Sequence, residues 1–385
     1  MTPQARAQAA IEILDEVIAA ARDQGAAADT IVQRYFKARR YAGSKDRRAV
    51  RELVYAAIRR AGERPASGRA ALIGLAEDRP ELADLFDGSP HAPAPIAGDE
   101  PRAPAAQMPG WLADRLSGCG LEGRAPLDVR VNRLKAVRDS VAIEGAVPTP
   151  HSPDGLRLPE GAQVEALPAF AQGLIEVQDE GSQLVAAACG AKPGMRVIDL
   201  CAGAGGKTLA LAASMANEGH ILACDTDRAR LSRLMPRAGR AGVGIVETRL
   251  LDPNREMEAL SDQQASADLV LVDAPCSGTG TWRRNPEARW RLTPERLARL
   301  TALQARLLDC ATALTRPGGR LAYVTCSLLD EEGAEQARAF LARHPGWRAG
   351  TPRFMIGRPR GPGVILTPAH NGTDGFFFAE LIAPC

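Results

Sequence analysis

The chain has 385 residues, which is more than one ordinary domain and suggests two or three. Apolar residues make up 45% and charged residues 24%, the balance of a soluble globular protein, and no run of eighteen apolar residues predicts a membrane-spanning helix. The net charge is only +2, so the molecule as a whole is not a strongly basic nucleic-acid binder.

The start of the chain does not resemble a secretory signal, because acidic residues interrupt the first apolar run, MTPQARAQAAIEILDE. The eight cysteines form no CxxC pair and no compact framework. In a chain of this size we expect them to be reduced thiols, at least one of which can react, and we expect a cytoplasmic location. A monomer is the default expectation for the oligomeric state.

The first predicted domain is helical and spans residues 1–86. Apolar residues recur at helical spacing, first in Ala5, Ala9, Ile13 and Val17 and again within residues 50–58. Residues 31–60 carry ten Lys or Arg against two acids. This charge is compatible with a solvated helix face or with a surface that contacts phosphates.

Two short segments follow the helical domain. Residues 87–108 are rich in proline and nearly free of large apolar side chains, which predicts a linker. Residues 109–172 contain a predicted helix near 109–118 and a predicted strand, LDVRVNRL, at 127–134. They are interpreted as a small α+β module.

From residue 173 to residue 385 strand and helix patterns alternate, which predicts an open, mostly parallel, doubly wound α/β sheet. Helices are expected at 207–217 and 293–315, among others. The predicted strands are MRVIDL (195–200), HILACD (220–225), GIVETRL (244–250), ADLVLVDAP (267–275), GRLAYVTCS (319–327) and DGFFFAELI (374–382). Ligands of such sheets bind at the carboxyl ends of the strands, where the chemically interesting residues of this chain fall.

A glycine-rich turn, VIDLCAGAGGKT at 197–208, joins the first of these strands to a helix. A phosphate-binding P-loop is excluded because Cys201 stands where its first glycine is required. A dinucleotide fingerprint matches at Gly203 and Gly205 but fails at Thr208. An S-adenosylmethionine loop of the class I methyltransferases and an ordinary strand-to-helix turn both remain compatible.

Two carboxylates accompany this turn. Asp199 ends the strand before it, and Asp225 ends the next strand about twenty residues later. A carboxylate at the second position accepts hydrogen bonds from a ribose diol in nicotinamide-binding and S-adenosylmethionine-binding folds alike. The loop alone therefore does not decide between an oxidoreductase and a methyltransferase.

Two cysteines follow two neighbouring strands. Cys276 comes just after Asp273 at the end of the fourth strand, and Cys326 ends the fifth. A single such cysteine is usually a core residue, but two at one sheet edge can face one substrate. Thiolate addition to C6 of cytosine makes C5 able to attack an electrophilic methyl group, and a base must then remove the C5 proton. A carboxyl group such as that of Asp273 can stabilise the charge that develops on the ring.

Several motifs resemble those of the RNA cytosine-5 methyltransferase family of the Fmu and Sun type. They are CAGAGGKT, DAPCSGTGTWRRNPE, YVTCSLLDEEG, QDEGSQLVA, RVN and DGFFFAEL, and they cover roughly residues 125–382. The segment GSKDRRAVRELVYAAIRR at 43–60 resembles the NusB-like RNA-binding domain. Together these features are most similar to the bacterial ribosomal RNA small subunit methyltransferase B group.

The resemblance implies roles for individual residues. Cys326 is the expected nucleophile, and Cys276 is expected to help release the product. DNA cytosine-5 methyltransferases use the cysteine of the PC motif instead, so a nucleophile at Cys326 favours RNA. The resemblance of the N-terminal segment implies small-subunit ribosomal RNA as the substrate. Asp273 is expected between the methionine end of the cofactor and the base, and Lys207 is expected to point toward the active site.

The implied cofactor is S-adenosyl-L-methionine. Asp225 is expected to hold its ribose, and Asp252, at the end of the third strand, to lie near its adenine. The family loop usually reads AAPGGK, so the AGAGGK of this chain is expected to bind the cofactor more loosely. The residues expected to line the cofactor are Cys201, Ala202, Gly203, Ala204, Gly205, Gly206 and Lys207.

Other hypotheses remain at this point. A non-catalytic RNA-binding or ribosome-assembly protein and a transfer RNA cytosine-5 methyltransferase both fit the motifs, whereas a nicotinamide-dependent oxidoreductase gives no reason for two cysteines at strand ends. Trp282, Arg283 and Arg284 are compatible with a stacking and phosphate-binding loop for a flipped nucleotide or with a solvated loop around a buried Trp. The five histidines are dispersed, so no metal site is expected. No membrane partner is expected either, because the sequence has no long apolar run.

Overall fold

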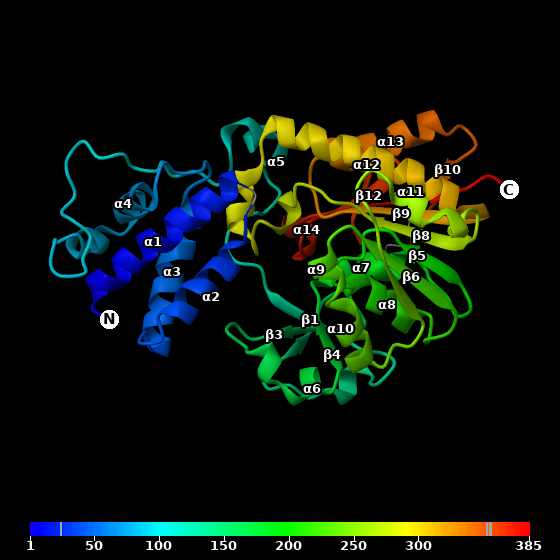
Figure 1. Cartoon of the computed structure of the whole chain (residues 1–385), viewed down its shortest axis with the longest axis horizontal. Helices are drawn as coiled ribbons and strands as arrows, with labels where there is room; N and C mark the ends of the chain where they lie inside the picture. Colours follow the sequence, from blue (N-terminus) through cyan, green and yellow to red (C-terminus); the bar gives the residue numbers. More distant parts are fainter. Residues whose placement is uncertain (24, 352, 354–355) are drawn as a thin grey trace. The chain divides into compact units, whose positions relative to one another are not determined.

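The computed structural model describes residues 1–23, 25–351, 353 and 356–385, and it divides the chain into two compact units (Figure 1). The helical unit comprises residues 1–124 and 281–294, and the sheet unit comprises residues 125–280 and 295–385. This division differs from the predicted domain boundaries. The short helical stretch predicted near 109–118 and the segment after the PC motif both belong to the helical unit.

The helical unit packs amphipathic helices around one apolar core. The stripe predicted from the sequence is buried, with Ala9, Ile13 and Val17 at 2% exposure or less. The first helix begins where the side chain of Thr2 accepts a hydrogen bond from the amide of Ala5. The α-helices of this unit are α1 (Pro3–Arg22), α2 (Ala28–Ala38), α3 (Ser44–Arg60), α4 (Gly68–Asp78) and α5 (Ala113–Leu116). The NusB-like identity of this unit stays a prediction.

The proline-rich segment 87–108 contains no helix or strand among its described residues, as its composition predicts. It is nevertheless held against the helices of its own unit. The amide of Ala103 donates to the carbonyl of Ala70 at 3.0 Å, and Arg69 forms an ion pair with Glu100 at 2.5 Å. The segment therefore packs against the helical unit and is not a freely moving linker.

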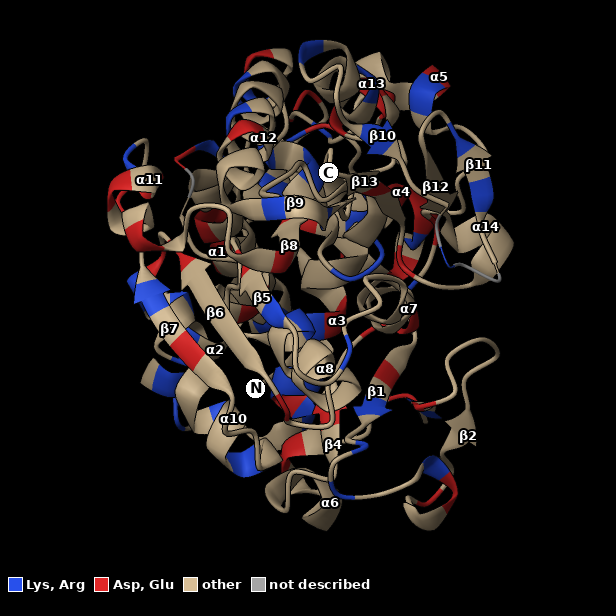
Figure 2. Ribbon diagram, turned by 90° about the vertical axis from the view of Figure 1, so that its right-hand side faces the viewer, with Lys and Arg blue, Asp and Glu red and all other residues tan. Residues whose placement is uncertain are grey.

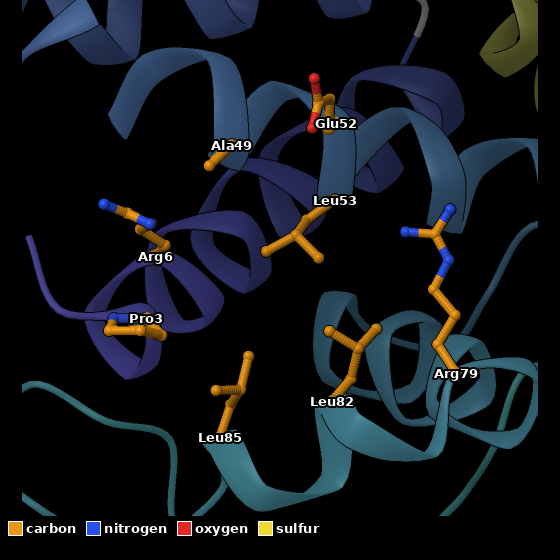
Figure 3. A pocket seen from close by; sticks show the side chains of 8 residues that line it. All are labelled: Pro3, Arg6, Ala49, Glu52, Leu53, Arg79, Leu82 and Leu85. Atoms are coloured by element: carbon orange, nitrogen blue, oxygen red, sulfur yellow. The ribbon is translucent and has the colours of Figure 1, made fainter. Parts of the chain in front are cut away.

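A hollow of about 210 Å³ also lies in the helical unit (Figure 3). Apolar side chains such as Leu53, Leu82 and Leu85 line it, and Arg6, Glu52 and Arg79 complete its wall. None of the residues predicted to be catalytic or cofactor-binding takes part in it.

The sheet unit begins with the predicted α+β module, which forms a four-stranded antiparallel sheet in the order β2-β3-β1-β4. Its apolar core is formed by alternate residues such as Val129, Val131 and Ile175. Its elements are β1 (Leu127–Val131), β2 (Val147–Pro148), β3 (Gly155–Leu158), α6 (Pro168–Ala171) and β4 (Ile175–Val177). Of these strands, only β1 was anticipated from the sequence.

The main sheet has the strand order β11-β12-β13-β9-β8-β5-β6-β7, with β10 paired to β13. The five strands predicted from residues 195–327 are parallel neighbours, and β13 joins β9 in antiparallel orientation. The mostly parallel, doubly wound class I fold is confirmed. The strands are β5 (Arg196–Asp199), β6 (His220–Asp225), β7 (Val246–Leu250), β8 (Ala267–Asp273), β9 (Thr315–Thr325), β10 (Arg348–Ala349), β11 (Arg358–Arg360), β12 (Gly363–Leu366) and β13 (Phe376–Ile382).

Helices cover both faces of this sheet, with α7 and α8 on one face and α12 and α13 on the other (Figure 1). Successive strand residues face opposite sides, so Val197 packs in one apolar cluster and Ile198 in the other. The helices of this unit, α12 beginning at the unit boundary, are α7 (Glu180–Ala188), α8 (Gly206–Ser214), α9 (Arg228–Leu231), α10 (Leu234–Ala241), α11 (Glu256–Ala259), α12 (Pro294–Leu314), α13 (Ala334–Arg343) and α14 (Pro368–Asn371).

Candidate active site

The predicted site residues gather at the carboxyl ends of four adjacent parallel strands. Asp199 ends β5, Asp225 ends β6 and Asp273 ends β8. Cys276 lies three residues beyond β8, and Cys326 directly follows β9. Since β6, β5, β8 and β9 are consecutive in the sheet, residues up to 127 positions apart share one edge.

The two cysteines are in contact, with their Sγ atoms 3.3 Å apart. Backbone hydrogen bonds fix the loops that carry them: the amide of Ala274 donates to Val324, and that of Gly280 donates to the carbonyl of Cys326 at 3.0 Å. The hydrogen bond to Cys326 raises the pKa of Cys276 well above its usual value, and burial raises it further. Two thiols from neighbouring strand ends therefore meet at one place.

Gly280 explains why the sequence between the cysteines reads SGTGT. The amide of Gly375 donates to the carbonyl of Gly280 at 2.8 Å, so the segment leading to β13 lies directly against this loop. A Cβ atom on Gly280 would come within 2.2 Å of the carbonyl oxygen of Gly375. Only glycine permits this approach, which links the DGFFF motif to the cysteine pair.

Lys207, in the first turn of α8, forms an ion pair with Asp273, with Nζ 2.7 Å from Oδ2. Burial lowers the pKa of Lys207, but the attraction of Asp273 outweighs it and the net shift is upward. The ammonium group also lies 5.3 Å from the ring centroid of Phe376. Two residues that were expected separately at the site are thus in direct contact, a pairing that the sequence did not predict.

The glycine-rich turn is held open by left-handed residues and by carboxylates on either side. Gly203 and Gly205 have φ values of 55° and 85°. The amide of Gly203 donates to Oδ2 of Asp225, and the amide of Asp227 donates to Oδ1, both at 2.7 Å. A carboxylate has about four acceptor positions, so Asp225 retains capacity for a ribose diol.

The outer side of the turn is braced by α10. Arg237 donates to the carbonyl of Ala204 at 2.6 Å and pairs with Glu176 of β4 at 2.9 Å. Glu176 is 3% exposed and also pairs with Arg240, so it contacts two basic residues of α10. Figure 2 shows the basic positions on α10 in blue and the acidic positions near β4 in red. The small antiparallel sheet thus fixes the shape of the cofactor loop, a role that the sequence did not indicate.

Asp199 has a buried carboxylate with one oxygen left over. Its Oδ2 accepts from the hydroxyl of Thr208 at 2.7 Å, and its Oδ1 has no hydrogen-bond partner among the described residues. Burial raises the pKa of Asp199 to about 7. A buried acceptor oxygen without a partner suits a hydrogen-bond donor such as the ammonium group of an amino-acid moiety, so the residues present fit S-adenosylmethionine.

Two of the predicted cofactor residues have less distinctive surroundings. Asp252 is exposed, two residues beyond the end of β7, and its expected place near an adenine stays a prediction. Cys201 is packed with the apolar residues of the sheet, and burial raises its pKa well above its usual value. We therefore expect Cys201 to shape the loop and not to react.

A polar network beneath the cysteines was not anticipated. Glu332, fully buried, accepts hydrogen bonds from the amide of Ser277 at 2.9 Å and from Gln304 at 3.0 Å. The hydroxyls of Ser277 and Thr279 lie 3.2 and 3.1 Å from that of Ser327. The available signal was the polar residues directly after each cysteine and the acids at 330–332, which were recognised as parts of motifs without a role.

The loop after the PC motif had two interpretations, a stacking Trp or a buried Trp, and its structure matches the second. Trp282 is 1% exposed, with the guanidinium of Arg289 5.8 Å from its ring centroid. A ring this buried does not offer a stacking surface, so the proposed stacking role of Trp282 is wrong. The alternative, a loop around one buried Trp, is what the structure contains.

Metal-binding clusters and membrane-spanning helices are both absent from the described residues. No group of three or more His, Cys, Asp or Glu side chains is arranged to hold a metal ion in that part of the chain. No helix within it is long and apolar enough to cross a membrane.

Comparison with known proteins identifies the family. Residues 186–382, about half of the chain and most of the main sheet, match the family described as 16S rRNA methyltransferase RsmB/F. The chain belongs to this family. The matched region contains all four strand ends described above, the glycine-rich turn and both cysteines.

Individual relatives agree with this assignment. The ribosomal RNA small subunit methyltransferase B of Salmonella newport (strain SL254) is 37% identical over 291 residues, which cover 71% of this chain. The chain spans 66% of that relative's length. Two relatives of known structure are PH0851 (26% identity, TM-score 0.78, 97% of this chain and 98% of that one) and a methyltransferase homologue from Pyrococcus horikoshii (29% identity, TM-score 0.59, 71% and 91%). The fold is that of the class I S-adenosylmethionine-dependent methyltransferases.

Proposed function

We propose that this protein transfers a methyl group from S-adenosylmethionine to C5 of a cytosine in RNA, most specifically small-subunit ribosomal RNA. The observation that carries the proposal is the contact between two thiols, 3.3 Å apart, at the sheet edge that also carries Lys207 and Asp273. Membership of the 16S rRNA methyltransferase RsmB/F family supports both the reaction and the class of RNA. S-adenosylmethionine supplies the electrophilic methyl group.

Cys326 is the proposed nucleophile. Its thiolate adds to C6 of cytosine, which makes C5 nucleophilic enough to take a methyl group. Burial lowers the pKa of Lys207, but Asp273 and, to a smaller extent, the charge of Cys326 raise it overall, so this ammonium group belongs to the same site as the proposed nucleophile. Asp273 holds that ammonium group, and its proposed role is to stabilise the charge that develops on the cytosine ring.

Cys276 is the proposed partner in product release. After methylation the C5 proton must leave before the bond from Cys326 to C6 can break, and this elimination needs a base at the ring. Cys276 is in contact with Cys326, so its sulfur is close to the cytosine that Cys326 is proposed to attack. The Cys276 thiol first releases its own proton to solvent, and its raised pKa then makes the thiolate a strong acceptor for the C5 proton. The electron pair of the C5–H bond re-forms the C5–C6 double bond as the bond from C6 to Cys326 breaks.

The helical unit offers a surface for the RNA backbone. Part of its basic charge is neutralised within the unit, for example Arg34 by Glu16 and Arg51 by Asp29. Other cations near the turn between α2 and α3 are exposed and form no ion pair among the described residues: Lys37, Arg40, Lys45 and Arg48. Exposed cations of this kind neutralise phosphates, and the resulting affinity falls with added salt.

The test of this proposal uses the variant Cys276→Ala. Incubated with S-adenosylmethionine and small-subunit ribosomal RNA, it is expected to accumulate a covalent RNA–protein species that resists denaturation, because the adduct forms but is not released. The double variant lacking Cys326 is the matched control and is expected to form none. Absence of a covalent species from Cys276→Ala, with folded protein and bound cofactor, refutes the assigned role.

A further inference from the structure

We propose that Glu332 is a positioning residue for the cysteine pair: it holds the loop of Cys276 against Cys326 and places a carboxylate beside that loop. Glu332 belongs to η8 (Asp330–Glu332), a short 3₁₀ turn after β9. It has no place in the reaction described above. The inference deepens the proposed function, and its part concerning product release rests on that function.

The contacts of Glu332 converge on the residue next to Cys276. Its carboxylate accepts hydrogen bonds from both the amide and the hydroxyl of Ser277. Gln304 of α12 bridges the same parts, donating to Glu332 at 3.0 Å and to the carbonyl of Pro275 at 2.9 Å. The residues on both sides of Cys276 are therefore tied to one buried carboxylate.

The second set of contacts ties this carboxylate to the strand that carries Cys326. The hydroxyl of Tyr323, three residues before Cys326, donates to the carbonyl of Glu332 at 2.6 Å. Beside it, the hydroxyl of Ser277 lies 3.2 Å from that of Ser327, the residue after Cys326. Each cysteine is thus held through its chain neighbours, and the 3.3 Å separation of the sulfurs depends on this network.

The charges around the pair are arranged asymmetrically. Lys207, paired with Asp273, acts on Cys326, whereas Glu332 and the phenol of Tyr323 lie around Cys276. The hydrogen bond with Cys326, burial, the charge of Cys326 and then the charge of Glu332 all raise the pKa of Cys276. A negative charge beside Cys276 opposes ionisation of its thiol. We infer that Glu332, through its contacts and its charge, controls when Cys276 gives up its proton.

A matched control exists in the same unit. Glu180, at the start of α7, is also fully buried and also accepts hydrogen bonds from two backbone amides, those of His151 and Ser152. Its contacts involve no cysteine loop. Replacing either glutamate by glutamine removes one buried charge while preserving shape, so loss of stability alone cannot separate them but an effect on Cys276 can.

The first readout is the pH dependence of Cys276 alkylation by iodoacetamide, followed peptide by peptide by mass spectrometry without RNA or cofactor. In Glu332→Gln the midpoint is expected to move to lower pH, because a negative charge that opposes the thiolate is gone. Glu180→Gln is expected to keep the midpoint of the unaltered protein. An unchanged midpoint in Glu332→Gln overturns the inference, whatever the protein methylates.

The second readout is the lifetime of the covalent RNA adduct. Glu332→Gln is expected to slow release on the order of tenfold or more, since positioned acid–base groups contribute about 100-fold or more to such steps, and to leave cofactor affinity unchanged. Ser277→Ala, which removes a single contact to Glu332, is expected to slow it by a smaller factor and serves if Glu332→Gln does not fold. Release at the normal rate in both variants overturns the inference. A failure of the proposed function is distinct, since then neither these variants nor Cys276→Ala forms an adduct.

Discussion

The buried carboxylate of Asp199 makes the stability of the sheet unit depend on pH in an unusual direction. Its pKa is raised from 3.8 to about 7, so the folded chain keeps a proton that the unfolded chain has already released. This contribution costs nothing below the unfolded pKa. Stability is lost as the pH rises from about 4 to about 7, and the loss is complete above that range. Replacement by Asn, which does not titrate, removes the dependence.

The size of the effect follows from the shift. A difference of about three pKa units corresponds to about 4 kcal/mol at high pH, of which roughly 2.5 kcal/mol develops between pH 5 and pH 8. Asn at this position still accepts from Thr208 but places an unpaired amide where Oδ1 stood, which costs a constant amount at every pH. The titration of Asp199 is therefore read from how the difference in unfolding free energy between the two proteins changes with pH, and not from the size of that difference at one pH.

The assay is urea-induced unfolding of the cofactor-free protein and of Asp199→Asn from pH 5 to pH 8. The variant is expected to gain about 2.5 kcal/mol relative to the unaltered chain over this interval. Asp268→Asn is the matched control: hydrogen bonds from Arg196 and Arg316 outweigh its burial and lower its pKa, so its carboxylate stabilises the fold above its unfolded pKa and loses that effect in acid. If the difference in unfolding free energy between Asp199→Asn and the unaltered protein stays constant from pH 5 to pH 8, the pKa of Asp199 is not raised by burial.

Two further predictions concern the support of the cofactor loop. Gly205→Ala is expected to destabilise the protein by about 1–3 kcal/mol, because Gly205 has a left-handed φ of 85° and a Cβ there would lie 2.6 Å from a leucine of α10. Gly206→Ala is the control, because a Cβ on Gly206 meets no atom within 4 Å. Urea unfolding measures both variants, and equal losses of stability would contradict the prediction. Glu176→Gln is expected to cost about 3 kcal/mol and to weaken S-adenosylmethionine binding in calorimetry, because Arg237 then loses the buried charge that holds it on the loop. The exposed Glu247→Gln is expected to cost less than about 1 kcal/mol, and a similar cost for both glutamates would speak against the bracing role.

Much of the sheet unit was predictable because its signals are local. Strands such as HILACD are short apolar runs bounded by turns, and each ends on a residue that the fold carries to the same edge. The two cysteines were predicted to face one substrate because adjacent parallel strands end together, and their sulfurs are in contact. Topology alone brings residues 276 and 326 to one place.

Other features depend on contacts that leave no pattern in the sequence. Glu332 reads as one acid among three, and only the fold reveals that it is buried and bound to Ser277. Glu176 occupies a short strand whose role as a brace requires the helix that bears Arg237. Trp282 is a plausible stacking residue on composition, but packing buries it. Burial and pairing between distant residues decided these cases, and neither is encoded in local periodicity.

The central claim is that Cys326 attacks the cytosine, and Cys326→Ala tests it most directly. The measurement is transfer of a labelled methyl group from S-adenosylmethionine to small-subunit ribosomal RNA, with cofactor affinity determined on the same protein by calorimetry. We expect methyl transfer to disappear and cofactor affinity to be retained, because the cofactor loop and Asp225 follow other strands of the sheet. Methyl transfer at the normal rate by Cys326→Ala would show that Cys326 is not the nucleophile.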